Sequence, residues 1–178
     1  MTISRSRIYN FDTAVPHIDT VLDAAAFLEE ETMLLAVKIL LTIVTLGYSL
    51  IPALADLNKT HATNPRWTGH ARFHCVWQVV SYIILAIAML AIIWFPILPE
   101  RPQLILPLVA AVAVYGGFFA AVLGKRFYAG ENYDENGYPP VGGPLGLALD
   151  VNITIFTTMV AFVAVTAFLV SQLMTAAV

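Results

Sequence analysis

The chain has 178 residues, of which 59% are hydrophobic and only 12% charged, and its formal net charge at neutral pH is -3. A soluble domain carries about 25% charged residues, so this composition excludes an ordinary soluble protein and predicts an integral membrane protein. The nine Lys and Arg residues are scattered along the chain, which excludes a basic surface for nucleic acid. The one cysteine, Cys75, excludes an internal disulfide and a CxxC motif for zinc or redox chemistry.

The chain begins with a polar tail over residues 1–32, which lacks the apolar segment of a signal peptide. Apolar residues recur in this tail at helical spacing, and acidic residues stand between them. The pattern predicts a short amphipathic helix lying along the membrane interface, with a partner-binding helix as the alternative. The apolar positions of that helix are Ile18, Val21, Leu22, Ala25 and Leu28.

Residues 33–178 contain four apolar runs, and we expect them to form one transmembrane domain. The runs cover residues 33–54, 75–95, 104–123 and 150–174, and each is long enough to cross about 30 Å of hydrocarbon as a helix. The sequence therefore predicts an all-α fold, an integral membrane four-helix transmembrane bundle that runs up-down-up-down, with the interfacial helix at its N-terminus. Three prolines between residues 96 and 103 predict a tight hairpin between the second and third spans.

An even number of spans places both termini on one face of the membrane and the two long connections, residues 55–74 and 124–149, on the other. Basic residues near the spans are more frequent on the long-loop face, which carries Lys59, Arg66, Arg72, Lys125 and Arg126 against Lys38 and Arg101 on the opposite face. By the positive-inside rule, this excess predicts that the long loops face the cytoplasm, in a cell (inner) membrane. We expect loop 124–149 to fold as a lid over the other long loop.

Three of the spans carry polar side chains along one helical face. Such groups are costly in hydrocarbon unless they meet one another, so we expect the three faces to converge inside the bundle. They comprise Lys38, Thr42, Thr45, Ser49, Pro52 and Asp56 in the first span, His70, His74, Gln78 and Tyr82 at the second, and Asp150, Asn152 and Thr154 at the fourth.

The third span differs because it carries rows of small residues. Ala113, Gly117 and Ala121 recur every four residues, a spacing that lets another helix approach closely. This row predicts a docking surface for a second copy of the chain or for a partner helix. Tyr115 is the main polar side chain of this span, and we expect it to donate a hydrogen bond into the bundle interior.

Three of the four histidines lie between residues 61 and 74. His70 and His74 are one helical turn apart, a spacing that lets two imidazoles hold one metal ion. With His61 from the preceding loop and Asp56 from the end of the first span, they form a candidate set of three nitrogen ligands and one oxygen ligand for a transition metal, copper, iron or zinc. Two alternatives stay open: metal-free proton transfer or polar-ligand binding, and a structural role at the membrane surface.

This segment resembles a family of small four-span membrane proteins, bacterial and fungal, whose signature is close to THxxNPxWxxHARFHxxWQ. The matching residues here are Thr60, His61, Asn64, Pro65, Trp67, the run from His70 to His74, Trp77 and Gln78. The resemblance implies a four-span fold and no particular reaction. A looser similarity links Asp56, His61 and His74 to the copper-binding segment of the C subunits of membrane methane and ammonia monooxygenases, which use an Asp and two His thirteen positions apart.

From these patterns we expect a membrane enzyme, a metal-dependent oxidoreductase that acts on a lipophilic small molecule taken from the membrane lipid. The side chains expected to face the substrate are Gln78, Tyr82, Asp150, Asn152, Arg72 and Tyr115. The alternatives are a small-ligand or proton-coupled binding or transport module, and an accessory subunit of a membrane complex.

Overall fold

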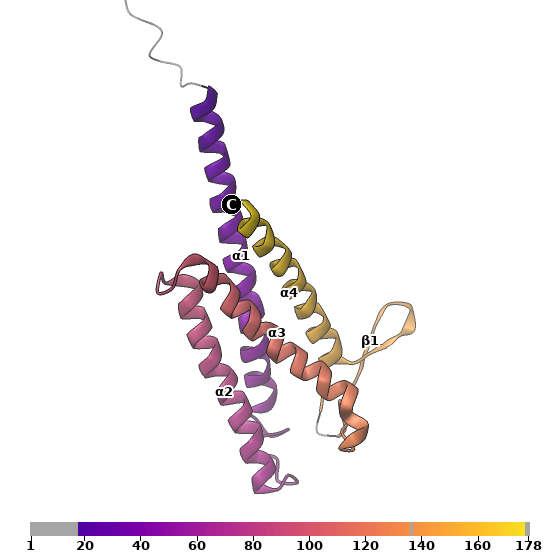
Figure 1. The fold of residues 1–178 in the computed structure, drawn as a ribbon. Helices are drawn as coiled ribbons and strands as arrows, with labels where there is room; N and C mark the ends of the chain where they lie inside the picture. Colours follow the sequence, from indigo (N-terminus) through magenta and orange to yellow (C-terminus); the bar gives the residue numbers. More distant parts are fainter. Residues whose placement is uncertain (1–17, 136, 177–178) are drawn as a thin grey trace, which may run out of the picture.

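The structure is a computed structural model that describes residues 18–135 and 137–176. Its main elements are four α-helices, α1 (Ile18–Asp56), α2 (Gly69–Trp94), α3 (Glu100–Gly124) and α4 (Val151–Ala176) (Figure 1). Within the described residues, all four are long and apolar enough to cross a membrane. The predicted all-α, integral membrane four-helix bundle is therefore confirmed.

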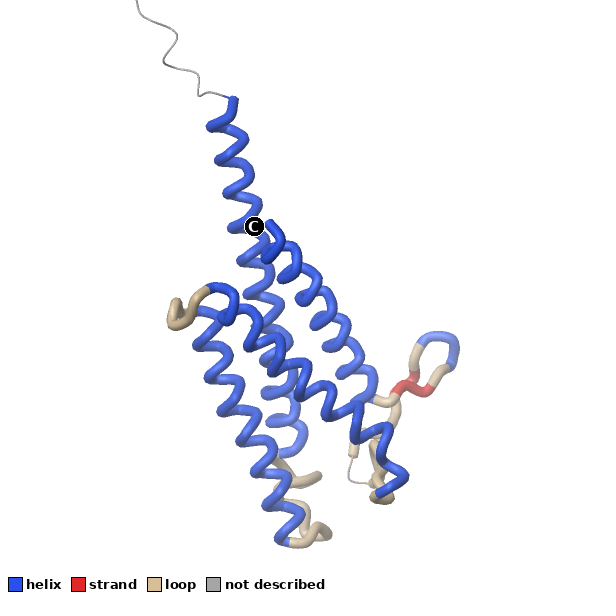
Figure 2. The backbone as a smooth tube through the Cα atoms, in the orientation of Figure 1, coloured by secondary structure: helices blue, strands red, loops and turns tan. Residues whose placement is uncertain are grey.

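The four helices run alternately up and down. The short α2–α3 hairpin lies toward the same end of the bundle as the C-terminus, and the two long connections lie at the opposite end (Figure 2). We call this opposite end the loop end. It gathers the last turn of α1, the first turns of α2 and α4, and the last turn of α3, so polar residues near these helix ends are brought to one face.

Helix α1 is a single element of 39 residues, about 58 Å long at 1.5 Å per residue. The helix expected for residues 18–28 is present, but it continues without a break into the first span. No Gly or Pro occurs between residues 18 and 46 to end it. Its first turns extend beyond the other helices (Figure 1), and Leu22, Phe27 and Leu28 are exposed there. An interfacial position for this extension stays a prediction.

Helix α1 also forms the centre of the bundle, because it packs against each of the other three helices. Its buried face repeats at helical spacing through Val37, Leu41, Val44 and Tyr48. The core has two clusters along this face. One contains Val37, Leu41, Ile93, Leu104, Val170 and Leu173, and the other, closer to the loop end, contains Val44, Tyr48, Ala86, Ala111, Tyr115 and Val163.

A glycine allows α1 and α3 to approach closely. A Cβ added at Gly47 would lie 2.5 Å from Tyr115 Oη and 2.7 Å from Met159 Sδ. The space left by the missing side chain lets the Tyr115 hydroxyl donate a hydrogen bond of 2.7 Å to the backbone carbonyl of Val44. Tyr115 therefore joins α1 to α3 in the core, and Met159 brings α4 to the same point.

The second long connection contains short elements: the 3-10 helices η2 (Lys125–Phe127) and η3 (Pro144–Gly146), and the strands β1 (Val141–Gly142) and β2 (Ala148–Leu149). The strands pair antiparallel, with Val141 opposite Leu149. This hairpin projects to the side of the bundle, away from α2 (Figure 1). The hairpin part of the loop therefore does not cover the histidine segment, because it pairs with itself beside the start of α4.

Candidate functional site

A cavity of about 270 Å³ lies between the four helices near the loop end. Every helix contributes to its wall, so the cavity depends on the assembled bundle. Its lining consists of Ile51, Pro52, Ala55 and Asp56 of α1, Gln78 and Tyr82 of α2, Val114, Gly117, Phe118 and Ala121 of α3, and Asn152 and Phe156 of α4.

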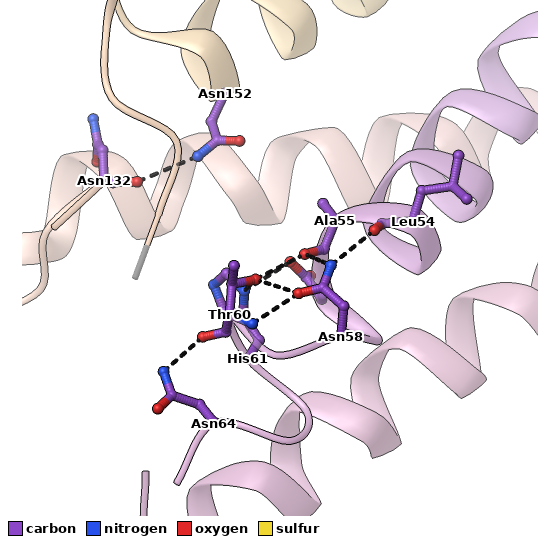
Figure 3. Close-up of polar contacts among 9 residues, drawn as sticks. Leu54, Ala55, Asn58, Thr60, His61, Asn64, Asn132 and Asn152 are labelled. Carbon is purple, nitrogen blue, oxygen red and sulfur yellow. Dashed lines mark hydrogen bonds and ion pairs between the residues drawn. The ribbon is translucent and has the colours of Figure 1, made fainter. Parts of the chain in front are cut away.

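The polar groups of the cavity come from three helices. Asp56 ends α1, Gln78 and Tyr82 lie one turn apart on α2, and Asn152 lies in the first turn of α4. The Gln78 amide donates to the Tyr82 hydroxyl at 3.3 Å. The Asn152 amide donates to the carbonyl of Asn132 at 3.2 Å, as Figure 3 shows. These hydrogen bonds fix the direction of both amides and leave their side-chain oxygens free to accept.

The rest of the wall is apolar and partly aromatic. The rings of Phe118 and Phe156 stack with centroids 4.2 Å apart, which joins α3 to α4 beside the polar groups. Gly117 and Ala121 line the cavity and are at the same time exposed on α3. Because these side chains are so small, the cavity reaches the lipid-facing surface of the bundle next to them.

His61 lies next to the cavity without lining it. The C-terminal end of α1 is closed by Asn58, whose amide donates to the carbonyls of Leu54 and Ala55 and whose Oδ1 accepts from the Thr60 backbone (Figure 3). This turn places His61 Nδ1 2.7 Å from Thr60 Oγ1 and 3.6 Å from Asp56 Oδ1. The imidazole therefore bonds to the Thr60 hydroxyl and lies just beyond hydrogen-bond distance of the carboxylate.

The other two histidines form a separate pair at the start of α2. His70 Nε2 and His74 Nε2 are 3.0 Å apart, and both side chains are exposed. Among the described residues, no three His, Cys, Asp or Glu side chains form a group that could hold a metal ion. The structure does not show His61, His70, His74 and Asp56 gathered into one ligand set, and the turn after α1 places His61 beside Thr60. A bound transition metal, copper, iron or zinc, stays a prediction.

Three of the side chains expected to face a substrate, Gln78, Tyr82 and Asn152, line the cavity. The structure places the other three elsewhere. Tyr115 is in the core, bonded to the Val44 carbonyl; Asp150 caps α4, because its Oδ1 accepts from the Ile153 backbone at 2.9 Å; Arg72 is half-buried on α2 outside the lining. Contact of any of these residues with a substrate stays a prediction.

The aromatic half of the wall was missed from the sequence. Val114, Phe118 and Ala121 follow one another at steps of four and three, so they share one face of α3. In an apolar span this face cannot be distinguished from ordinary packing. Of the predicted docking row, Gly117 and Ala121 line the cavity and Ala113 lies exposed beyond it. Docking of a second copy or of a partner helix on this row stays a prediction.

The two long connections touch each other at the loop end. Arg66 forms an ion pair with Glu135, and the hydrogen bond and charge of Glu135 raise the pKa of the Arg66 guanidinium. Both side chains are more than half exposed, so solvent screens the pair and it contributes little to stability. It ties the segment before α2 to the segment before the hairpin.

Comparisons with known proteins identify no family for this chain. No family model matches it, and neither a curated protein nor a solved structure gives a match. The resemblance of the Thr60–Gln78 segment to the four-span family therefore stays an expectation, and the function is argued from the site alone.

Proposed function

We propose that this integral membrane protein binds a small amphipathic molecule in the cavity between its four helices. The observation that carries the proposal is the cavity itself, whose wall combines an aromatic and aliphatic part with Asp56, Gln78, Tyr82 and Asn152. Binding sites for small molecules are usually concave and mostly apolar, with a few polar groups that fix the orientation of the ligand.

The size of the cavity limits the ligand. A volume of about 270 Å³ lies just below the range of about 300–1,000 Å³ that is usual for drug-sized ligands. A full phospholipid is therefore too large, and a molecule with one small ring or a short chain fits. Its polar end would lie against the polar groups at the loop end, and its apolar end against Phe118 and Phe156.

The bilayer is the proposed source of the ligand. The cavity reaches the lipid-facing surface at Gly117 and Ala121, and Gln78 is exposed on α2 across from them. A molecule dissolved in the membrane can reach the polar groups through this lateral opening. Binding is proposed in place of metal-dependent oxidation, because His61, His70 and His74 do not form one ligand set.

Two adjacent glycines of α3 offer a matched test. A Cβ at Gly116 or at Gly117 would meet nothing within 4 Å, so both positions tolerate a side chain, but only Gly117 lines the cavity. The probe is a benzyl alcohol that carries a photoactivatable diazirine, and the measurement is the labelling that excess benzyl alcohol displaces. We expect displaceable labelling in the wild type and in Gly116→Trp, and at least a tenfold weaker signal in Gly117→Trp. Equal labelling of the two variants would overturn the proposal.

We also propose that the long loops face the cytoplasm. Five basic residues near the spans lie at the loop end, and two lie at the other end. A reporter enzyme that is active only in the cytoplasm, fused after Val178, should be inactive if this orientation is correct. An active fusion would show that the protein has the opposite orientation.

A further inference from the structure

We infer that the cavity selects a small organic cation, an ammonium group attached to a short apolar or aromatic body. This inference rests on the proposed function and names its ligand class. It is argued from the charge, the free acceptors and the aromatic rings of the cavity wall.

The charge of the cavity wall favours a positively charged ligand. Among the described residues that line the cavity, Asp56 is the only Asp, Glu, Lys, Arg or His. No lysine or arginine of the part of the chain that the structure describes lines the wall, so the wall carries a negative charge when Asp56 is ionised. A ligand with a positive end is attracted by this charge, and a carboxylate or phosphate ligand is repelled.

The Asp56 carboxylate also has unused hydrogen-bond acceptors. His61 Nδ1 is 3.6 Å from Asp56 Oδ1, outside hydrogen-bond distance. The Thr60 hydroxyl lies 2.7 Å from both His61 Nδ1 and Asn58 Oδ1. His61 Nδ1 is therefore bonded to Thr60 rather than to Asp56. The carboxylate oxygens can therefore accept hydrogen bonds from a ligand.

The amides add further acceptors. The NH₂ groups of Gln78 and Asn152 already donate, to the Tyr82 hydroxyl and to the Asn132 carbonyl respectively. The side-chain oxygens of these two residues therefore remain as acceptors for a ligand that carries hydrogen-bond donors. An ammonium group carries three donors and no acceptor, so its hydrogen-bonding pattern complements a carboxylate and two amide oxygens.

Aromatic rings complete the match. Tyr82, Phe118 and Phe156 line the same cavity as Asp56, and the last two stack on each other. The face of an aromatic ring attracts a cation, most strongly where water is excluded. A cavity with one carboxylate and three aromatic side chains therefore favours an organic cation over a neutral molecule of equal size.

The test measures how well two compounds of the same shape displace the diazirine probe from the full-length protein in mild detergent. The compounds are benzylammonium and neutral benzyl alcohol. We expect benzylammonium to bind about 10- to 100-fold more tightly, the effect of one charge-assisted hydrogen bond. Asp56→Asn keeps the shape of the side chain and should abolish this preference. Glu29→Gln removes a negative charge from the exposed part of the same helix and should leave the preference unchanged.

Three outcomes separate the inference from the proposed function. A preference for benzylammonium that is lost in Asp56→Asn and kept in Glu29→Gln supports the inference. Equal displacement by both compounds, blocked in Gly117→Trp, overturns the cation preference and leaves the binding function in place. No displacement by either compound, or displacement insensitive to Gly117→Trp, overturns both.

Discussion

Replacement of Gly47 by alanine tests the close contact between α1 and its neighbours. The added Cβ would lie 2.5 Å from Tyr115 Oη and 2.7 Å from Met159 Sδ, well inside van der Waals distance. The sulfur belongs to a flexible side chain and can move, but the Tyr115 hydroxyl is held by its hydrogen bond to the Val44 carbonyl. The mutation therefore forces Tyr115 to shift and to weaken that bond.

The cost has three parts. Overpacking of a well-packed core destabilises by about 1–3 kcal/mol. Loss of the hydrogen bond between Tyr115 and Val44 adds about 0.5–1.5 kcal/mol. The higher helix propensity of alanine offsets about 1 kcal/mol of this. We expect Gly47→Ala to lower the free energy of unfolding by about 1–3 kcal/mol, the overpacking range quoted above.

The assay is reversible unfolding by a denaturing detergent in mixed micelles, followed by circular dichroism. Gly116→Ala is the matched control, because a Cβ there meets nothing within 4 Å, and it should be neutral or slightly stabilising. In a Tyr115→Phe background the hydroxyl is absent, so the Gly47→Ala substitution should cost at least about 1 kcal/mol less, within the usual range of coupling between contacting residues. If Gly47→Ala unfolds at the same detergent fraction as Gly116→Ala, the close contact is not as described.

Three further predictions concern single hydrogen-bonding groups and use the same unfolding assay. The buried Tyr48 hydroxyl lies near the Thr45 hydroxyl without a well-formed hydrogen bond among the described residues, so Tyr48→Phe should stabilise the protein by about 1 kcal/mol. A loss of that size would mean that Thr45 or a bound water satisfies the hydroxyl. Trp94→Phe removes the indole hydrogen bond to Thr42, 3.0 Å long, and should cost about 1 kcal/mol; no change would show that lipid or water replaces this bond. Asp150→Ala removes the hydrogen bond that caps the Ile153 backbone and should lower the free energy of unfolding by about 1 kcal/mol. Asp150→Ser keeps a capping oxygen and should lose much less stability, so equal losses in the two variants would exclude capping.

The fold was predictable from the sequence because hydrocarbon imposes a strong rule. Backbone groups in the bilayer must bond within their own segment, so four apolar runs become four helices. Helix ends were less predictable. The apolar run of the second span begins at residue 75, but α2 begins at Gly69, where the Thr68 hydroxyl caps it by accepting from the Ala71 backbone. The helical spacing of His70 and His74 indicated this start, whereas hydropathy did not. A capping threonine in a polar loop gives no signal in a hydropathy profile.

The candidate site was predictable in part. Gln78, Tyr82 and Asn152 could be placed near one another because each is polar and each falls on the interior face of its helix near the loop end. The assembly of the histidines could not be predicted, because His61 lies on a loop whose turn is set by Asn58. The hydrogen bonds of that turn place the imidazole beside Thr60.

The polar face of the first span predicted that Asp56 points into the bundle, but its aromatic surroundings were out of reach of the sequence. Its position at the end of the first span suggested a metal ligand, because three histidines follow it closely. The packing of α1 against three helices turns this residue into part of a cavity wall, next to aromatic side chains from spans whose hydropathy is uniform. Tertiary contacts between distant segments decide which apolar faces leave space between them.

Mapping the cross-links of the diazirine benzyl alcohol probe to individual residues tests the binding cavity most directly. The displaceable cross-links should fall on cavity-lining residues of separate helices, such as Ile51 on α1, Val114 on α3 and Phe156 on α4. Cross-links confined to lipid-facing residues such as Ile84 and Ile87 of α2, unchanged by excess benzyl alcohol, would contradict a binding cavity inside the bundle.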